Sequence, residues 1–192
     1  SKSLLQQAHN FDLIGYMEDD LIIEDKEFFE KIIYMVNSTN DDYVFLPHRC
    51  ERIPKHGEVV LSGDPDGGRP DLFWDTGETV TISWPLGNKT FYRATNPHSG
   101  CFFLTRKQAL IALDYWEKRN WKSNFFLSGP LEQAGSGILI PIFKLMKPIP
   151  NDYRFLMVRH HDQLWERHPF EESGISGSDA PELSEENLFK SF

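Results

Sequence analysis

Three consecutive carboxylates, Glu18, Asp19 and Asp20, stand between two apolar runs in the stretch LIGYMEDDLII. Carboxylates are costly to bury, so acids at the end of an apolar run need solvent, helix-terminal donors or a cation to take up their charge. A hard divalent cation held by carboxylate oxygens neutralises the acids and can also bind the phosphates of a small molecule. The alternative is that Asp19 or Asp20 caps the following turn and the other acids are solvated.

Two other stretches carry candidate site residues. Ser99 and Gly100 in NPHSGCFFLT are small, so the backbone there can approach a ligand closely, although Gly100 can equally relieve crowding at a strand start. His160 and His161 in FLMVRHHDQLW follow an apolar run, and alternation along a strand points their rings to opposite faces. An imidazole that joins two carboxylate oxygens suits Mn²⁺ better than oxygen ligands alone.

The elements that position these residues follow from hydrophobic periodicity. An apolar strand over 11–17 delivers the acids to its carboxyl end, and Asp25 is expected to cap a helix over 26–37. Thr105 and Gln108 stand in capping-box register at the start of an amphipathic helix over 105–121. Further strands are predicted over 43–49, 99–105, 143–150 and 154–161, a loop over 50–71, a β-hairpin over 79–95 and a helix start over 128–139.

This order of elements predicts an α/β fold, in which a mixed sheet is flanked by helices and interrupted by an antiparallel hairpin. Ligands of open α/β sheets lie beyond the carboxyl ends of the strands, which is where the three acids fall. The predicted domain covers residues 1–168, and residues 169–192 are predicted to be a flexible acidic tail rich in Ser, Gly and Glu.

These motifs, in this order, resemble the GT-A fold of nucleotide-sugar glycosyltransferases. The Glu-Asp-Asp triplet looks like the acidic DxD signature of that family, with glutamate in the first position. The resemblance implies a cofactor, Mn²⁺ or Mg²⁺, on the diphosphate of a sugar donor. Family members carry a run of strands and helices before this signature, so the chain is expected to be the C-terminal part of such a domain, without a complete pocket for the nucleotide base.

The resemblance also implies residue roles. Asp20 and one of His160 and His161 would bind the metal, while Glu18, Asp19, Ser99 and Gly100 would contact the donor. Glu132 in SGPLEQAG matches the carboxylate that deprotonates the acceptor hydroxyl in inverting members. A glutamate in the first turn of a helix is also favoured by the helix dipole alone. The implied partners are a nucleotide-sugar donor and a carbohydrate or glycoconjugate acceptor.

Aromatic side chains are candidates for acceptor contact, because indole rings stack on sugar faces. Trp74, Trp84 and Trp121 lie in or near loops around the hairpin and before Glu132, although most Trp residues serve packing. Two other functions remain open. One is a non-catalytic carbohydrate- or Ca²⁺-binding module, and the other is a glycoside hydrolase that uses Asp20 and Glu132 as its carboxylate pair.

Composition narrows the partners further. The chain has 20 basic and 29 acidic residues and a net charge of −9, which disfavours nucleic acid as a partner. No apolar run reaches the length of a membrane span. Cys50 and Cys101 have no zinc-type spacing but leave one disulfide bridge open. The sequons at Asn37 and Asn88 would fit a Golgi or secretory lumen, and would be irrelevant in a bacterial cytoplasm.

Overall fold

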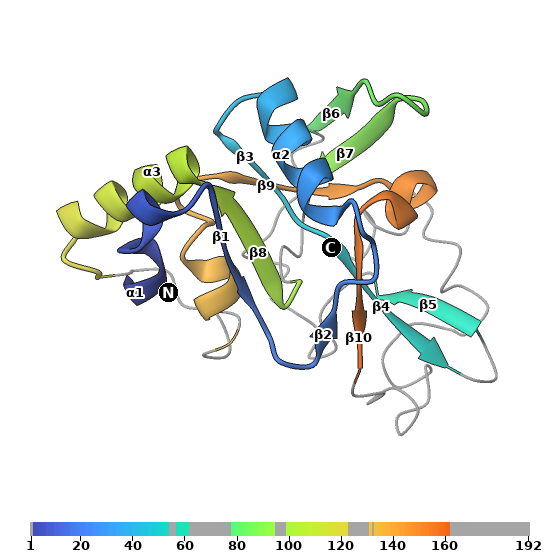
Figure 1. Cartoon of the computed structure of the whole chain (residues 1–192), viewed down its shortest axis with the longest axis horizontal. Coiled ribbons are helices and arrows are strands. Elements are labelled where there is room, and N and C mark those ends of the chain that lie inside the picture. Colours follow the sequence, from blue (N-terminus) through green and yellow to red (C-terminus); the bar gives the residue numbers. More distant parts are fainter. Residues whose placement is uncertain are drawn as a thin grey trace.

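The computed structural model describes residues 2–53, 57–61, 78–94, 99–122, 131 and 133–161, and of residues 51–53, 57–61 and 150 it describes the backbone alone. Within these ranges the chain forms a mixed α/β structure of several sheets and a few helices (Figure 1). The predicted tail over 169–192 lies outside the described residues. No helix in the described part is long and apolar enough to cross a membrane.

The strands form three sheets. Strands β1 (Leu13–Met17) and β8 (Cys101–Thr105) make an antiparallel pair. The second sheet has the order β2-β10-β4-β5 and contains β2 (Leu21–Ile22), β10 (Met157–His160), β4 (His48–Ile53) and β5 (Gly57–Leu61). The third has the order β3-β9-β7-β6 and contains β3 (Tyr43–Phe45), β9 (Lys144–Pro148), β7 (Lys89–Arg93) and β6 (Thr79–Ile82).

Helices and short turns complete the described chain. Helix α1 (Lys2–Leu5) and the 3₁₀ turn η1 (Ala8–Asn10) precede β1, and α2 (Phe28–Ser38) follows β2. Helix α3 (Arg106–Lys118) follows β8 directly. After α3, the described chain continues with the π-helix η3 (Gln133–Gly137), then β9, and then the 3₁₀ helix η4 (Pro150–Phe155), which leads into β10.

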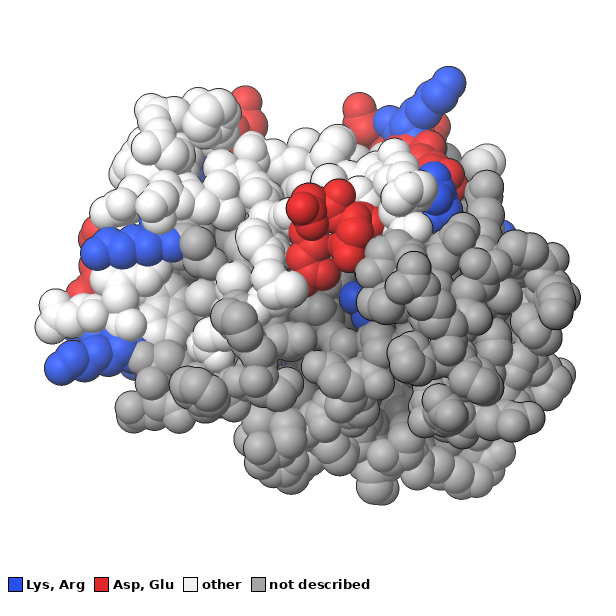
Figure 2. Space-filling view, turned by 90° about the horizontal axis from the view of Figure 1, so that it is seen from below, with Lys and Arg blue, Asp and Glu red and all other residues white. Residues whose placement is uncertain are grey.

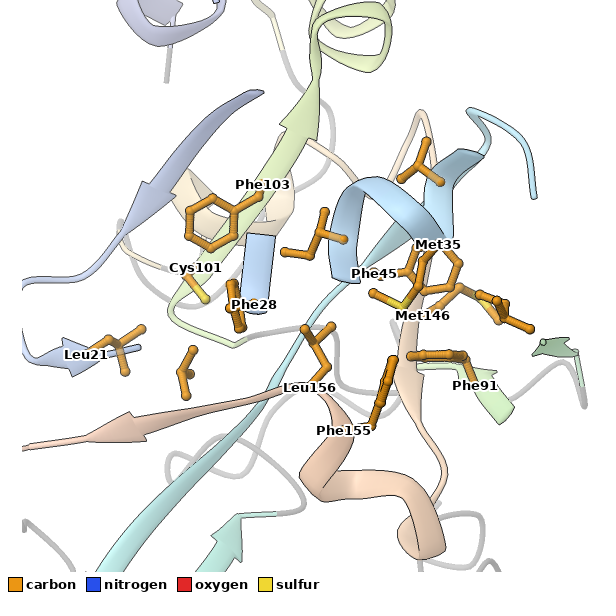
Figure 3. Packing of buried hydrophobic residues seen from close by; sticks show 14 residues of the cluster. Leu21, Phe28, Met35, Phe45, Phe91, Cys101, Phe103, Met146, Phe155 and Leu156 are labelled. Carbon is orange, nitrogen blue, oxygen red and sulfur yellow. The ribbon is translucent and has the colours of Figure 1, made fainter. Parts of the chain in front are cut away.

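Two large apolar clusters hold the elements together. One lies beneath α2 and joins all three sheets; in Figure 3, Leu21 of β2 and Cys101 of β8 lie at one end of it, and Phe91 and Phe155 at the other. The second cluster packs α1 and α3 against the other face of β1 and β8. Side chains of β8 pack alternately into the two clusters, with Phe103 in the first and Phe102 and Leu104 in the second. The pair of β1 and β8, which leads into the three acids, therefore has apolar core on both faces.

The sequence predicted most of these elements, and the pairing of β6 with β7 confirms the hairpin. The single strand predicted over 43–49 is wrong, because the chain breaks at Pro47 into β3 and β4, which belong to different sheets. The loop predicted from residue 50 is also wrong in part, since β4 and β5 pair as an antiparallel hairpin. Asp25 does not cap α2 itself; its carboxylate accepts from the Glu27 backbone N–H and from Lys31.

Gln108 joins α3 to the third sheet. The predicted capping box with Thr105 is present, and the Gln108 amide also donates to the Tyr43 carbonyl at 2.7 Å and to the Asp41 carbonyl at 3.2 Å. Gln108→Ala is expected to destabilise the fold by about 2–4 kcal/mol, because it removes the capping box and the donor to two part-buried carbonyls. Urea denaturation measures this, with the exposed Lys107→Ala as the control that should cost less than about 1 kcal/mol. A loss in Gln108→Ala no larger than that of the control would contradict this role.

Candidate functional site

The three acids form a tight turn at the end of β1. The Glu18 N–H donates to the Gly100 carbonyl at 2.9 Å, which extends the β1–β8 ladder by one residue, and the Leu21 N–H donates to the Glu18 carbonyl at 3.3 Å. Asp19 is exposed at the tip of this turn, while Glu18 and Asp20 are partly buried on either side of it. The turn therefore sends the three carboxylates in different directions. Figure 2 shows acidic atoms gathered on the face that carries this turn.

Asp20 contacts a histidine that lies 140 residues further along the chain. The His160 Nε2 and Asp20 Oδ2 atoms are 3.0 Å apart, and the side chains are 5% and 33% exposed. Antiparallel pairing of β2 with β10 sets this distance, because His160 is opposite Leu21 and the His161 N–H donates to the Asp20 carbonyl at 2.8 Å. The structure thus brings together two of the residues that the sequence singled out as metal ligands.

His161 faces away from this pair. Its ring is exposed, and its Nδ1 lies 3.4 Å from a guanidinium nitrogen of Arg159, which also binds Glu24. The alternation of the two histidines along β10 is as predicted, since His160 is buried and His161 is exposed. Of the two rings, His160 is the one within reach of Asp20.

Gly100 lies directly under the Glu18 carboxylate. Its φ of +67° favours glycine, and a Cβ at this position would lie 2.8 Å from Glu18 Oε2 and 2.8 Å from Leu21 Cδ1. The close approach predicted at Gly100 is therefore made by the chain's own acid. Ser99, its neighbour, is 1% exposed, and its Oγ has no hydrogen-bond partner among the described residues.

Gly100→Ala is expected to destabilise the protein by about 2–3 kcal/mol, because it combines a strained φ with contacts to Glu18 and Leu21. Gly87→Ala is the matched control: its φ is +108°, but a Cβ there would meet nothing within 4 Å. Because a φ of +108° lies farther from the left-handed α region than +67°, alanine is strained at Gly87 at least as much as at Gly100, so any larger loss in Gly100→Ala in urea denaturation reports the contacts. Equal losses would show that Glu18 does not depend on the missing side chain at Gly100.

The donor atoms at this turn fit a hard cation in part. Asp20 Oδ1 is a buried atom without a hydrogen-bond partner among the described residues. Two ligand atoms in neighbouring positions of an octahedral ion lie about 3.0 Å apart, which matches the separation of Asp20 Oδ2 and His160 Nε2. In the described ranges no group of three or more His, Cys, Asp or Glu side chains is arranged to hold a metal. The pair therefore fits the Mg²⁺ type of site, in which one or two side chains act together with substrate phosphates and water.

Two basic side chains of the described chain, one on β4 and one on β9, are buried. Arg49 on β4 is 7% exposed and Lys147 on β9 is 2% exposed. The pKa of the Cys101 thiol is raised to about 12, mainly by burial and also by Glu18, whereas Lys147 and Arg49 act to lower it. A basic residue inside an otherwise apolar strand, as in YVFLPHRC, was the signal that could have identified Arg49.

The cysteines are not bridged. Cys50 and Cys101 are both buried free thiols, and they belong to different apolar clusters. The disulfide that the sequence left open is therefore absent. Their fully buried positions make them small core residues.

Of the predicted acceptor residues, Trp84 and Trp121 lie in the described ranges, and both pack against other aromatic rings. Trp84 packs against Tyr34 and Phe155, and Phe155 lies at the end of the first cluster opposite Leu21 (Figure 3). Trp121 stacks on Trp116 beside α3. Trp74 and the predicted base Glu132 lie outside the described residues, although the backbone of η3 begins directly after Glu132. Acceptor contact by these residues stays a prediction.

Comparison with known proteins gives no independent assignment. No family model, no curated protein and no solved structure matches this chain.

Proposed function

We propose that the protein is a metal-dependent glycosyltransferase that moves a sugar from a nucleotide-diphosphate donor to an acceptor hydroxyl. The observation that carries this proposal is the contact between Asp20 and His160, because it joins a carboxylate and an imidazole at the carboxyl end of β1. The mixed α/β structure, with its acidic turn followed by β8 and α3, is compatible with the GT-A-like domain that the motifs resemble.

In this proposal Asp20 and His160 hold Mn²⁺ or Mg²⁺ on the donor diphosphate. When bound, the cation stabilises the negative charge of the departing nucleoside diphosphate. Glu18 is held against Gly100, and it fixes the shape of the turn from which Asp20 projects. Asp19, exposed at the tip, and Ser99 remain candidate donor contacts, and Glu132 is the candidate base that takes the proton of the acceptor hydroxyl.

A screen of nucleotide sugars tests this function. The full chain is incubated with each donor, with and without Mn²⁺, and the release of nucleoside diphosphate is measured in the presence and absence of simple sugar acceptors. The proposal expects release with at least one donor, loss of that activity with EDTA and recovery on addition of Mn²⁺.

The other outcomes identify the alternative functions. Activity on glycosides that survives EDTA would favour a hydrolase with a carboxylate pair. Cation binding without turnover of any donor would favour a non-catalytic carbohydrate- or Ca²⁺-binding module. Either result would contradict the proposed transferase.

A further inference from the structure

Two sequons of the chain, at Asn37 and Asn88, have no part in the proposed transfer reaction. An Asn-X-Thr sequon marks a site where the asparagine amide can receive an N-linked glycan in a secretory lumen. Both sequons have threonine in the third position and neither has proline in the second, so the sequence does not rank them. Their surroundings in the structure differ, and that difference favours one of them.

Asn88 lies in the connection between β6 and β7, at the tip of the hairpin. The chain turns there, and the Gly87 N–H donates to the Trp84 carbonyl at 3.0 Å. Residues 85–88 are all exposed, and Leu86 is 88% exposed. A Cβ added at Gly87 would meet no atom of the described chain within 4 Å. The tip therefore has room for a bulky, hydrated group on Asn88.

The other two residues of this sequon are held by η4 and β6. The Asp152 carboxylate accepts from Lys89 Nζ at 2.8 Å and from the Thr90 N–H at 2.9 Å. Thr90 Oγ1 lies 3.0 Å from Thr81 Oγ1 on the paired strand, in an exposed contact that leaves the hydroxyl further hydrogen-bonding capacity. No side-chain hydrogen bond ties Asn88 itself to the described part of the chain. The start of β7 thus presents the Asn88 amide to solvent.

Asn37 has a different setting, in the last turn of α2. Its backbone is helical, since α2 extends over Phe28–Ser38. The hydroxyl of Thr39, the third residue of this sequon, donates to the Met35 carbonyl at 2.8 Å. The sequon needs that hydroxyl as well as the amide, so the helix already uses one of the two groups that define the acceptor.

The hairpin tip is remote from the acid turn. In Figure 1 the connection between β6 and β7 lies at the upper right, whereas the turn between β1 and β2 lies near the lower ends of those strands. A glycan at the tip would therefore not cover the Asp20–His160 pair. Modification of Asn88 is compatible with the proposed function and does not depend on it.

We propose that Asn88 is an N-glycosylation site, and that the chain is modified there in preference to Asn37. The co-substrate is an oligosaccharide joined through its first N-acetylglucosamine to a lipid diphosphate, and a membrane-bound transferase of the secretory lumen supplies it. The Asn88 amide nitrogen forms a bond to C1 of that sugar and gives up a proton. The bond from C1 to the diphosphate oxygen breaks, and the lipid diphosphate leaves with the bonding electrons.

Peptide mapping of the protein isolated from the cells that make it is the direct test. Peptide N-glycosidase in heavy-oxygen water converts each glycosylated asparagine to an aspartate that carries heavy oxygen. We expect this label at Asn88 and little or none at Asn37. An unlabelled Asn88, or an Asn37 labelled as strongly as Asn88, would overturn the proposal.

Secretion of the full chain from eukaryotic cells, behind a secretory leader, tests the two sequons with matched variants. The glycosidase-sensitive shift in electrophoretic mobility is expected to disappear in Asn88→Gln and to persist in Asn37→Gln. Both asparagines are exposed, so neither substitution is expected to disturb the fold. An undiminished shift in Asn88→Gln, or its loss in Asn37→Gln, would contradict the assignment of Asn88.

Thr90→Ala and Thr90→Ser separate the sequon from a general effect on the hairpin. Alanine removes the hydroxyl while Asn88 stays, so the glycan should be lost. Serine keeps a hydroxyl in the third position, so the glycan should be retained. A glycan that survives Thr90→Ala, or one that is lost in Thr90→Ser, would overturn the proposal. Because occupancy is measured on the peptide and not through activity, this inference and the proposed function can fail separately.

Discussion

Asp20→Asn is expected to weaken Mn²⁺ binding by on the order of 100-fold, and to reduce sugar transfer by at least as much. The reason is that an amide supplies no negative charge to a hard cation. Because asparagine keeps an oxygen near His160 Nε2, the turn and its pairing with β10 should persist. Calorimetry with Mn²⁺ and the donor-release assay measure the two losses, and circular dichroism reports whether the fold is retained.

Asp19→Asn is the matched control for this variant. The two acids are neighbours and the substitutions are chemically identical, but Asp19 is exposed at the tip of the turn while Asp20 faces His160. Asp19→Asn is expected to change Mn²⁺ affinity by less than about fivefold, which corresponds to a solvent-screened charge. If Asp19→Asn weakened Mn²⁺ binding more than Asp20→Asn did, the cation would have to bind on the outer side of the turn.

Acidification is expected to destabilise the fold through His48. This ring is fully buried, and its pKa is lowered to about 3, mainly by burial and further by Lys147. Its Nε2–H donates to the Pro148 carbonyl at 2.7 Å, which ties β4 to the end of β9. An unfolded chain protonates this histidine near pH 6.5, whereas the folded chain does not, so stability is lost as the pH falls below 6.5 and the loss levels off near pH 3.

The size of the effect is measurable. At pH 5 the loss of stability attributable to His48 is about 2 kcal/mol. This is a large share of the free energy of unfolding of a typical domain, which is about 5–15 kcal/mol. His48→Gln removes the titration and keeps an N–H donor for Pro148. Urea denaturation of both proteins at pH 7 and pH 5 tests this: the stability advantage of the wild type should shrink by about 2 kcal/mol between the two pH values. A constant advantage would mean that His48 is not the group responsible.

Much of the fold followed from local patterns. The apolar run before the acids formed β1, and the Thr105–Gln108 spacing produced the capping box at the start of α3. The hairpin β4–β5 escaped prediction because its residues are rich in charge and contain Pro54 and Gly57, a composition that is typical of loops. The break at Pro47 was not predicted either, because the residues around it form one apolar run in the sequence. The chain passes at that point from the sheet of β3 to the sheet of β4.

The candidate site was predictable only in part. The sequence could nominate Asp20 and the two histidines, but the choice of His160 depends on the register of β2 with β10, which a single sequence does not contain. The position of Glu18 depends on the positive φ of Gly100. Long-range pairing thus decides which of the candidate side chains meet.

Whether His160 coordinates a bound cation together with Asp20 can be measured directly. Pulsed electron paramagnetic resonance of the Mn²⁺-loaded protein detects nitrogen nuclei that are bonded to the metal. We expect one imidazole nitrogen coupling in the wild type, its retention in His161→Gln and its disappearance in His160→Gln. A Mn²⁺ signal without nitrogen coupling, or a coupling that survives His160→Gln, would show that Asp20 and His160 do not hold the metal together.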